Sequence, residues 1–274
     1  MTVALEVTIR PRQGWQWLDL HELWEYHELL GFLVWRDIKV RYKQTMLGAV
    51  WALLQPLIGM LVFGALFTKV AHIETGAIPY SLFVFAGLVP WTFFANALSF
   101  ASVSLVGSEQ MIRKTYFPRM FIPLASILAL GIDMFIGLGF TGLLMLYYHW
   151  HFTASIFWLP LCMMSLFMST CGLGLIFSAL NVKYRDVKYA LPFLIQTGFF
   201  LTPVIYPSRY IPERFKLVLG LNPMAGTLEG FRHALLGTSM SPIVVVTSVV
   251  VSVLLFLFGL IYFHRMERSF ADII

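Results

Sequence analysis

The sequence predicts an all-α integral membrane protein, and three observations support that prediction. Of the 274 residues, 59% are hydrophobic and 12% are charged, which is about half the charged fraction of a typical soluble domain. Six apolar stretches approach or exceed the roughly 20 residues that a helix needs to cross a bilayer. Lysine and arginine gather between these stretches, as they do in membrane loops, so nucleic acid is not expected as a partner.

The six stretches are expected to be transmembrane helices, because backbone inside a bilayer must satisfy its own hydrogen bonds. They cover residues 45–68, 78–108, 120–148, 152–180, 189–208 and 243–263. The second is long enough to tilt or to kink near Pro90, and the fifth is the shortest and contains Pro192 and Pro203. Six spans place both termini on the same side of the membrane.

The distribution of basic residues orients the chain. Fourteen of the 19 lysines and arginines lie before the first stretch, after the last, or in the second and fourth connections. By the positive-inside rule, these regions face the cytoplasm. The predicted organisation is a cytoplasmic segment over residues 1–43, one transmembrane domain over residues 44–264, and a cytoplasmic tail over residues 265–274.

A basic amphipathic helix is predicted just before the first span. Its two faces carry Val34, Ile38 and Tyr42 on one side, and Arg36, Lys39 and Lys43 on the other. Such a helix lies naturally in the cytoplasmic headgroup region of a bilayer. It either anchors the chain there, or it transmits motion or lines an entry gate, and the sequence leaves these readings open.

Two short helices are predicted between the fifth and sixth spans. Residues 212–220 and 223–237 each begin with proline and end with glycine, as helices often do, and Asn222 is a plausible N-cap for the second. The second helix has an apolar face, formed by Leu228, Phe231 and Leu235, and its polar residues are expected elsewhere, namely Glu229, Arg232 and His233. These helices either dip back into the membrane or form an external cap.

Motifs for catalysis and nucleotide binding are absent from the sequence. It contains no G-x-x-x-x-G-K-[ST] loop, no H-E-x-x-H and no G-x-S-x-G. Cys162 and Cys171 are expected to be small packing residues, and His149 with His151 is a weak pattern for a metal site. We therefore expect a chain that is not an enzyme and binds no metal or cofactor, so energy for transport would come from a partner or an ion gradient.

Asp133 is the only acidic residue within a predicted span, and no lysine or arginine lies in any span to pair with it. An intramembrane carboxylate is costly and usually functional. A proton pathway normally needs a relay of several such groups, so a structural role is favoured here. In that role Asp133 would be protonated or hydrogen-bonded to serine, threonine or backbone.

Two predicted cytoplasmic loops combine charged and aromatic residues. Residues 108–119 read SEQMIRKTYFPR and residues 181–192 read NVKYRDVKYALP. They either cap the spans or dock a soluble partner. Both loops resemble segments of the ABC-2 type permease family, in particular the permeases that export O-antigen, teichoic acid and capsule polysaccharides. The same resemblance extends to residues 36–56 (RDIKVRYKQTMLGAVWALLQP) and 221–237 (LNPMAGTLEGFRHALLG).

The resemblance implies a homodimer in the bacterial inner membrane, paired with two copies of a separate ATPase that holds ATP and magnesium, and moving a lipid-linked glycan. The ATPase-coupling loop would comprise Glu109, Gln110, Met111, Ile112, Arg113, Lys114, Tyr116 and Arg119. The substrate entrance would comprise Trp35, Arg36, Lys39 and Arg41. The two short helices would be re-entrant helices near the external exit.

In similar permeases, the first and fifth helices line the pathway. Aromatic rings stack weakly on the C–H faces of sugars, and conduction favours many shallow sites over one deep site. The expected path residues are therefore Phe63, Phe67, Phe193, Phe199, Phe200 and Tyr206. The alternatives are an ABC-2 permease for a drug or a lipid, an ion-coupled secondary transporter working alone, and a membrane-embedded enzyme.

Overall fold

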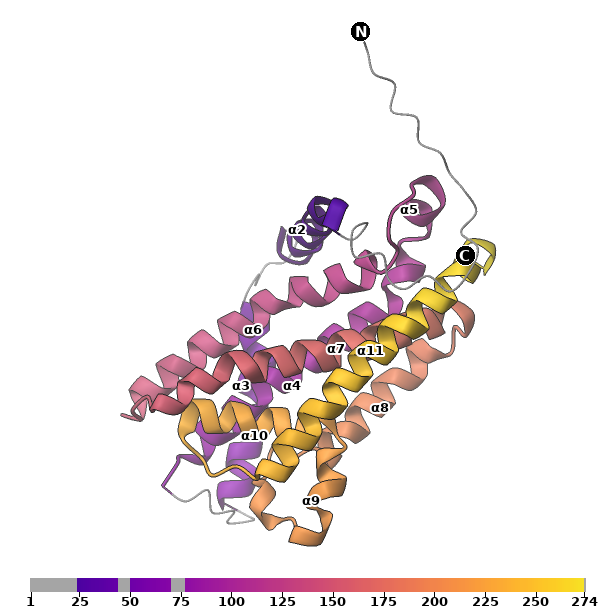
Figure 1. Ribbon diagram of the computed structural model, residues 1–274. Coiled ribbons are helices and arrows are strands. Elements are labelled where there is room, and N and C mark those ends of the chain that lie inside the picture. The colour runs from indigo at the N-terminus through magenta and orange to yellow at the C-terminus, as the bar shows by residue number, and fades with distance from the viewer. Residues whose placement is uncertain (1–23, 44–49, 70–76, 274) are drawn as a thin grey trace.

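The computed structural model describes residues 24–43, 50–69 and 77–273 (Figure 1). The α-helices are α2 (His27–Lys43), α3 (Val50–Lys69), α4 (Tyr80–Gly107), α5 (Glu109–Lys114), α6 (Phe121–Tyr147), α7 (Leu159–Lys183), α8 (Val187–Leu201), α9 (Glu213–Gly220), α10 (Pro223–Leu236) and α11 (Pro242–Ile273). Two short 3-10 helices are η1 (Ala154–Trp158) and η2 (Ser208–Tyr210). The residues described contain no strand, so the predicted all-α class is confirmed.

Five helices within the described ranges are long and apolar enough to cross a membrane. They are α3, α4, α6, α7 together with η1, and α11. Each coincides with a predicted span, and α4 continues through Pro90 without interruption. The chain is therefore a multi-pass membrane protein.

The fifth predicted span is shorter in the structure than in the sequence analysis. Helix α8 has 15 residues, which gives a length of about 22 Å at about 1.5 Å per residue. It ends at Leu201 because Thr202, which precedes Pro203, is extended with ψ 139°. Residues 202–205 are nevertheless buried and return the chain toward α4 and α10. The total of six crossings stays a prediction.

Helix α4 is the centre of the bundle and packs against α3, α6, α7, α8 and α10. Helices α7 and α11 form the most extensive pairing, which brings Gly172 and Gly259 together. A Cβ atom at either glycine would collide with backbone of the other helix, so only glycine permits this approach. By contrast, 6% of the apolar window of α3 is buried. One long face of α3 is therefore not covered by the protein.

A second hydrophobic core lies at one end of the bundle. It joins Leu33 of α2, Ile112 of α5, Phe121 of α6 and Phe263 and Phe270 of α11. Figure 1 shows α2, α5 and the C-terminal end of α11 at the same end of the molecule. The first and last described helices thus meet on one side, which supports an even number of crossings. Helix α11 also continues through the residues of the predicted tail, and the domain boundaries stay predictions.

The two predicted short helices are present as α9 and α10. The Asn222 side chain accepts a hydrogen bond from the backbone N–H of Met224 at 3.0 Å, and Gly237 ends α10 in the left-handed conformation with φ 69°. Helix α10 packs against α4, α7 and α11. Gly226 and Gly230 face Ser248 and Cys162, where any larger residue would clash. This enclosure favours a re-entrant helix over an external cap.

The prediction that Glu229 and Arg232 lie away from the packed face of α10 is wrong. Glu229 is only 6% exposed, and Arg232 is only 3% exposed. Arg232 is therefore a buried charge and not a solvated one on an external loop. The physical reason is that neighbouring helices surround α10, so no face of its middle turns reaches solvent.

Candidate functional site

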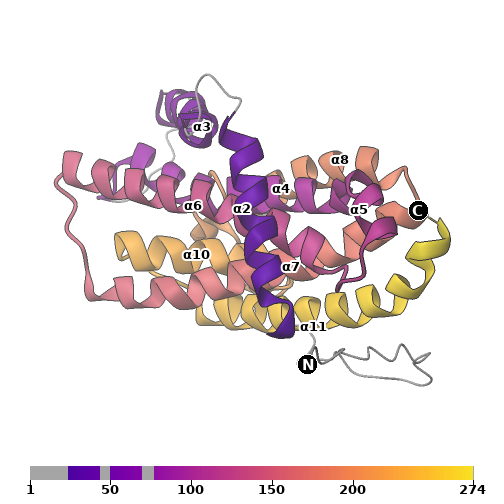
Figure 2. The same cartoon turned by 90° about the horizontal axis from the view of Figure 1, so that it is seen from above.

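Helix α2 crosses α6 at the end of the bundle that also carries α5 (Figure 2). The contacts to α6 come from residues spaced four apart. Asp37 accepts a hydrogen bond from Ser126 Oγ at 3.3 Å, and Arg41 reaches Asp133. The two predicted faces of α2 did not include Arg41, which pairs with a carboxylate of α6. Its guanidinium points into the bundle because a carboxylate on α6 attracts it.

Asp133 lies near the middle of α6 and is held by two side chains from α2. Arg41 Nη2 is 2.7 Å from Asp133 Oδ2, and the Tyr42 hydroxyl donates a hydrogen bond to Oδ1. Burial, together with this hydrogen bond, raises the pKa of Tyr42, so the phenol keeps its proton at physiological pH. The expected serine, threonine or backbone partners of Asp133 are not what holds it. The partners come instead from α2, which lies outside the predicted spans.

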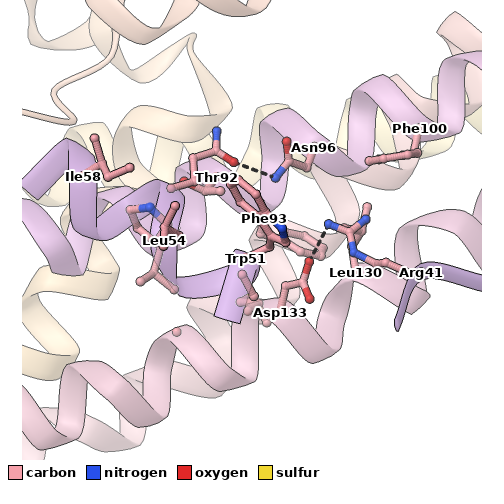
Figure 3. A pocket seen from close by; sticks show the side chains of 16 residues that line it. Arg41, Trp51, Leu54, Ile58, Thr92, Phe93, Asn96, Phe100, Leu130 and Asp133 are labelled. Carbon is pink, nitrogen blue, oxygen red and sulfur yellow. Dashed lines mark hydrogen bonds and ion pairs between the residues drawn. The ribbon is translucent and has the colours of Figure 1, made fainter. Parts of the chain in front are cut away.

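Two adjoining cavities meet at the Arg41–Asp133 pair, and Figure 3 shows the inner one. One, of about 420 Å³, lies between α3, α4 and α6, and the other, of about 570 Å³, lies between α2, α4 and α6. They share Arg41, Trp51, Ala52, Phe100, Leu130 and Asp133. We call the combined space the α2–α6 cleft. It runs from α2 into the helix bundle, and the ion pair stands where its two parts join.

The inner part of the α2–α6 cleft mixes aromatic and amide side chains. Trp51, Phe93 and Phe100 provide flat apolar surfaces, and Asn96 donates a hydrogen bond to Gln55 at 3.3 Å. An apolar pocket with a few placed polar groups is the usual form of a small-molecule site. Such a lining fits a ligand that is partly apolar and partly hydroxylated or charged.

The four residues expected at the entrance divide into two pairs. Arg36 and Arg41 line the α2–α6 cleft. Arg36 also pairs with Asp37 at 2.8 Å and donates to Met111 Sδ at 3.8 Å, which links α2 to α5. Trp35 is exposed outside the cleft, and the Lys39 ammonium lies 5.2 Å from the centre of its ring. The outer pair suits an interfacial position, where aromatic and basic residues gather.

The eight residues expected to couple to an ATPase also divide. Four are exposed, namely Gln110, Arg113, Lys114 and Tyr116. Ile112 is instead buried in the second core, and Met111 contacts Arg36. Arg119 is tied to α11, because its Nη1 donates to the Glu267 carbonyl at 2.8 Å and its backbone N–H donates to Glu267 Oε1 at 3.0 Å. Helix α5 is thus an exposed element with an anchored inner side.

Aromatic rings on α3, α4 and α8 form a connected row that we call the aromatic ladder. Its successive members are Phe83, Tyr80, Phe67, Phe63, Phe199, Trp91 and Phe94, with ring centres 5.6–6.5 Å apart. Of these, only Phe63, Phe67 and Phe199 were predicted from the sequence. The α4 members were not predicted, because a uniformly apolar span gives no signal that separates a ladder ring from any other core ring.

The remaining expected path residues lie at the edge of the ladder. Phe193 and Phe200 are 69% and 59% exposed on α8. Phe200 contacts Phe199 with ring centres 5.4 Å apart, and the Tyr206 hydroxyl donates to the Phe200 carbonyl at 3.2 Å. Within the described part of the chain, no other aromatic ring packs against Phe193, so the structure does not join it to the ladder.

Comparison with known proteins identifies the family. Residues 28–236 match the family described as ABC-2 type transporter. The chain belongs to the ABC-2 type transporter family. The match includes α2, the α2–α6 cleft, α5, the aromatic ladder and α10, so every part of the candidate site lies within it.

Individual relatives of this ABC-2 protein come from several bacteria. It is 30% identical over 251 residues to the O-antigen export system permease protein RfbA of Klebsiella pneumoniae, covering 90% of this chain and 95% of that protein. The chain is 30% identical to the O-antigen export system permease protein RfbA of Myxococcus xanthus, over 78% of this chain and 82% of that protein. It is 26% identical to the polysialic acid transport protein KpsM of Escherichia coli, over 73% of this chain and 78% of that protein.

Proposed function

We propose that the chain is the membrane permease subunit of an ATP-driven exporter of a lipid-linked polysaccharide. The observation that carries the proposal is the end-to-end similarity to permeases named for O-antigen export, supplemented by the similarity to a polysialic acid transport protein. The α2–α6 cleft and the aromatic ladder supply the two chemistries that such a substrate requires. ATP and magnesium would be held by a separate ATPase subunit.

The charged head of the substrate would enter through the α2–α6 cleft. A lipid-linked glycan carries phosphate next to its lipid, and guanidinium groups bind phosphate oxygens strongly. Arg41 is bound to one carboxylate, so a phosphate that enters the cleft competes with Asp133 for the same donor. Exchange of Asp133 for phosphate would loosen α2 from α6 and widen the entrance. Arg36, on the same cleft, would stabilise the second charge.

The glycan would then pass along the aromatic ladder. Stacking on a ring is weak for each sugar, and a row of rings offers several such contacts in succession. The exposed sides of α3 and α8, including Leu61, Val62 and Phe200, would face a second copy of the chain. A homodimer with the ladders beside the seam would enclose the path.

ATP-driven motion would reach the entrance through the second core. The exposed side of α5 would dock on the ATPase, with one ATPase copy for each permease. Leu33 of α2 and Ile112 of α5 share one buried cluster, and Arg36 contacts Met111. A displacement of α5 would therefore move α2. The charge distribution supports cytoplasmic termini in a bacterial inner membrane.

A deletion strain tests the proposal. Loss of the gene should remove the surface polysaccharide and leave lipid-linked glycan on the cytoplasmic side, and the wild-type chain should restore export. Arg41→Glu should fail to restore export, whereas the matched control Arg265→Glu, at an exposed position of α11 that does not line the cleft, should succeed. Unchanged surface glycan in the deletion strain would contradict the proposal and favour an exporter for a drug or a lipid.

A further inference from the structure

A small polar pocket lies at the end of the helix bundle opposite α5. Its lining includes Phe83, near the start of α4, whereas α5 follows the other end of that helix. Helix α4 has 28 residues, so at about 1.5 Å per residue its two ends are about 42 Å apart. The pocket holds about 140 Å³ and is lined by Ile78, Phe83, Pro207, Ser208, Arg209, Glu229, Arg232, Thr238 and Ser239.

The floor of this pocket is built from two buried charged residues on one turn of α10. Arg232 donates to the carbonyls of Pro203 at 2.6 Å, Val204 and Phe83 at 3.3 Å, and its Cζ lies 3.8 Å from the centre of the Phe83 ring. Glu229 accepts hydrogen bonds from Ser208 Oγ and, at 3.4 Å, from the backbone N–H of Ser241. The floor is thus fixed in position before any ligand arrives.

The lining chemistry restricts the ligand class. A cation would meet two guanidinium groups, from Arg209 and Arg232. Arg232 already donates to three carbonyls, and the Glu229 carboxylate beside it repels an anion from the floor, so a neutral ligand fits best. A carboxylate has about four acceptor positions, and two hydrogen bonds reach Glu229 among the described residues. Hydroxyl groups of a ligand would therefore find a strong acceptor beside the serine and threonine hydroxyls.

The pocket also continues the aromatic ladder. Phe83 is the last ring of the ladder and lines the pocket, with Tyr80 6.5 Å away along the row. Ile78 and Pro207 add apolar surface opposite the polar groups. A ring with C–H faces and several hydroxyls matches this combination of apolar walls and polar floor. The volume limits the ligand to one small ring.

We propose that this pocket is a monosaccharide subsite that receives a single sugar unit of the glycan at the end of the aromatic ladder. The inference rests on the proposed function, because it assigns the sugar to the exported polymer. It adds a site at the end of the path opposite α5, with Glu229, Thr238 and Ser239 as the groups that contact sugar hydroxyls. Retention of one unit there would oppose backward sliding of the glycan between ATP-driven steps.

Saturation-transfer NMR on the purified chain in lipid nanodiscs tests the subsite. The probes are the methyl glycosides of glucose, galactose, mannose and N-acetylglucosamine. Ser239→Trp fills the pocket, and Thr153→Trp is the matched control, because Thr153 is also an exposed hydroxyl residue in a connecting loop but does not line the pocket. We expect saturation transfer to at least one glycoside with the wild type and with Thr153→Trp. Ser239→Trp should raise the apparent Kd of that glycoside about tenfold or more, and a tenfold change corresponds to about 1.4 kcal/mol of binding free energy.

A second variant covers the case in which Ser239→Trp fails to fold. Thr238→Val removes one hydroxyl at nearly constant volume and leaves the Thr238 carbonyl, which contacts His233 Nδ1, in place. It should weaken binding by about twofold to tenfold, as expected for one lost hydrogen bond. Equal binding by folded variants and wild type would overturn the subsite. If no glycoside binds to a preparation that still exports glycan with its ATPase, the subsite is wrong and the proposed function stands.

Discussion

Arg41 at the end of α2 and Asp133 in the middle of α6 form an ion pair with 2.7 Å between Nη2 and Oδ2. The pair joins a helix outside the spans to a carboxylate within one. Because it stands where the two parts of the α2–α6 cleft meet, the same contact that fixes α2 also narrows the cleft. A structural contact of this kind becomes a gate when a ligand competes for one partner.

A double-mutant cycle of Arg41→Ala and Asp133→Asn tests the coupling between these residues. Each single change should reduce stability by about 1–3 kcal/mol, since the partner loses its counter-charge in a largely buried position. The double variant should lose less than the sum, with a coupling energy of about 0.5–3 kcal/mol. Thermal unfolding in detergent measures all four proteins. Strictly additive losses would show that the two side chains do not interact in solution.

Substitutions of exposed and of buried residues in the α5 segment should have different effects, the first on ATPase docking and the second on stability. Tyr116→Ala should reduce co-purification of the ATPase while the melting temperature of the permease is unchanged, because Tyr116 is 72% exposed. Ile112→Ala should instead destabilise the permease by about 2–4 kcal/mol, because it opens a cavity in the second core. Pull-down and thermal unfolding of both variants separate docking from folding. Wild-type ATPase recovery with Tyr116→Ala would contradict the docking assignment.

Phe199 should matter more for transport than any other aromatic residue of α8. Its ring contacts Phe63, Trp91 and Phe200, so Phe199→Ala breaks the aromatic ladder in the middle. Each lost ring pair removes about 0.5–1.5 kcal/mol of interaction. Export by Phe199→Ala should fall severalfold, whereas the control Phe157→Ala, 85% exposed on η1, should export normally. Equal export by both variants would remove the ladder from the path.

Arg232→Lys should destabilise the protein although the charge is conserved. The guanidinium reaches three carbonyls at once, on α4 and on the loop after α8, and an ammonium group cannot reproduce that fork. Leaving buried carbonyls unpaired costs about 1–3 kcal/mol each, so we expect a loss of at least that size. Thermal unfolding provides the measurement. A melting temperature equal to wild type would show that Arg232 is not a clamp.

Features fixed by local chemistry were predicted well from the sequence. The Asn222 cap, the Gly237 end of α10 and the five long apolar helices each depend on a few neighbouring residues. The early end of α8 was not predicted, although its cause, Pro203, is also a local feature of the sequence. These properties need no knowledge of what packs against the segment.

Features fixed by long-range packing were missed. The partner of Asp133 comes from a helix far away in sequence, and no pattern in either segment identifies the other. Glu229 and Arg232 were placed outside the packed face because charged residues are usually exposed, and only the enclosure of α10 by three helices reverses that expectation. The segments that form the site could therefore be predicted from the sequence, whereas the contacts between their side chains could be found only from the folded structure.

The most direct test of the permease assignment is affinity purification of the tagged chain in mild detergent, followed by reconstitution with lipid-linked glycan. We expect a P-loop ATPase to purify with the chain in equal amount, and the reconstituted pair to move the glycan only when ATP is hydrolysed. Arg41→Glu should preserve the ATPase complex but abolish transport. A chain that purifies without an ATPase and moves no glycan with ATP would contradict the central claim.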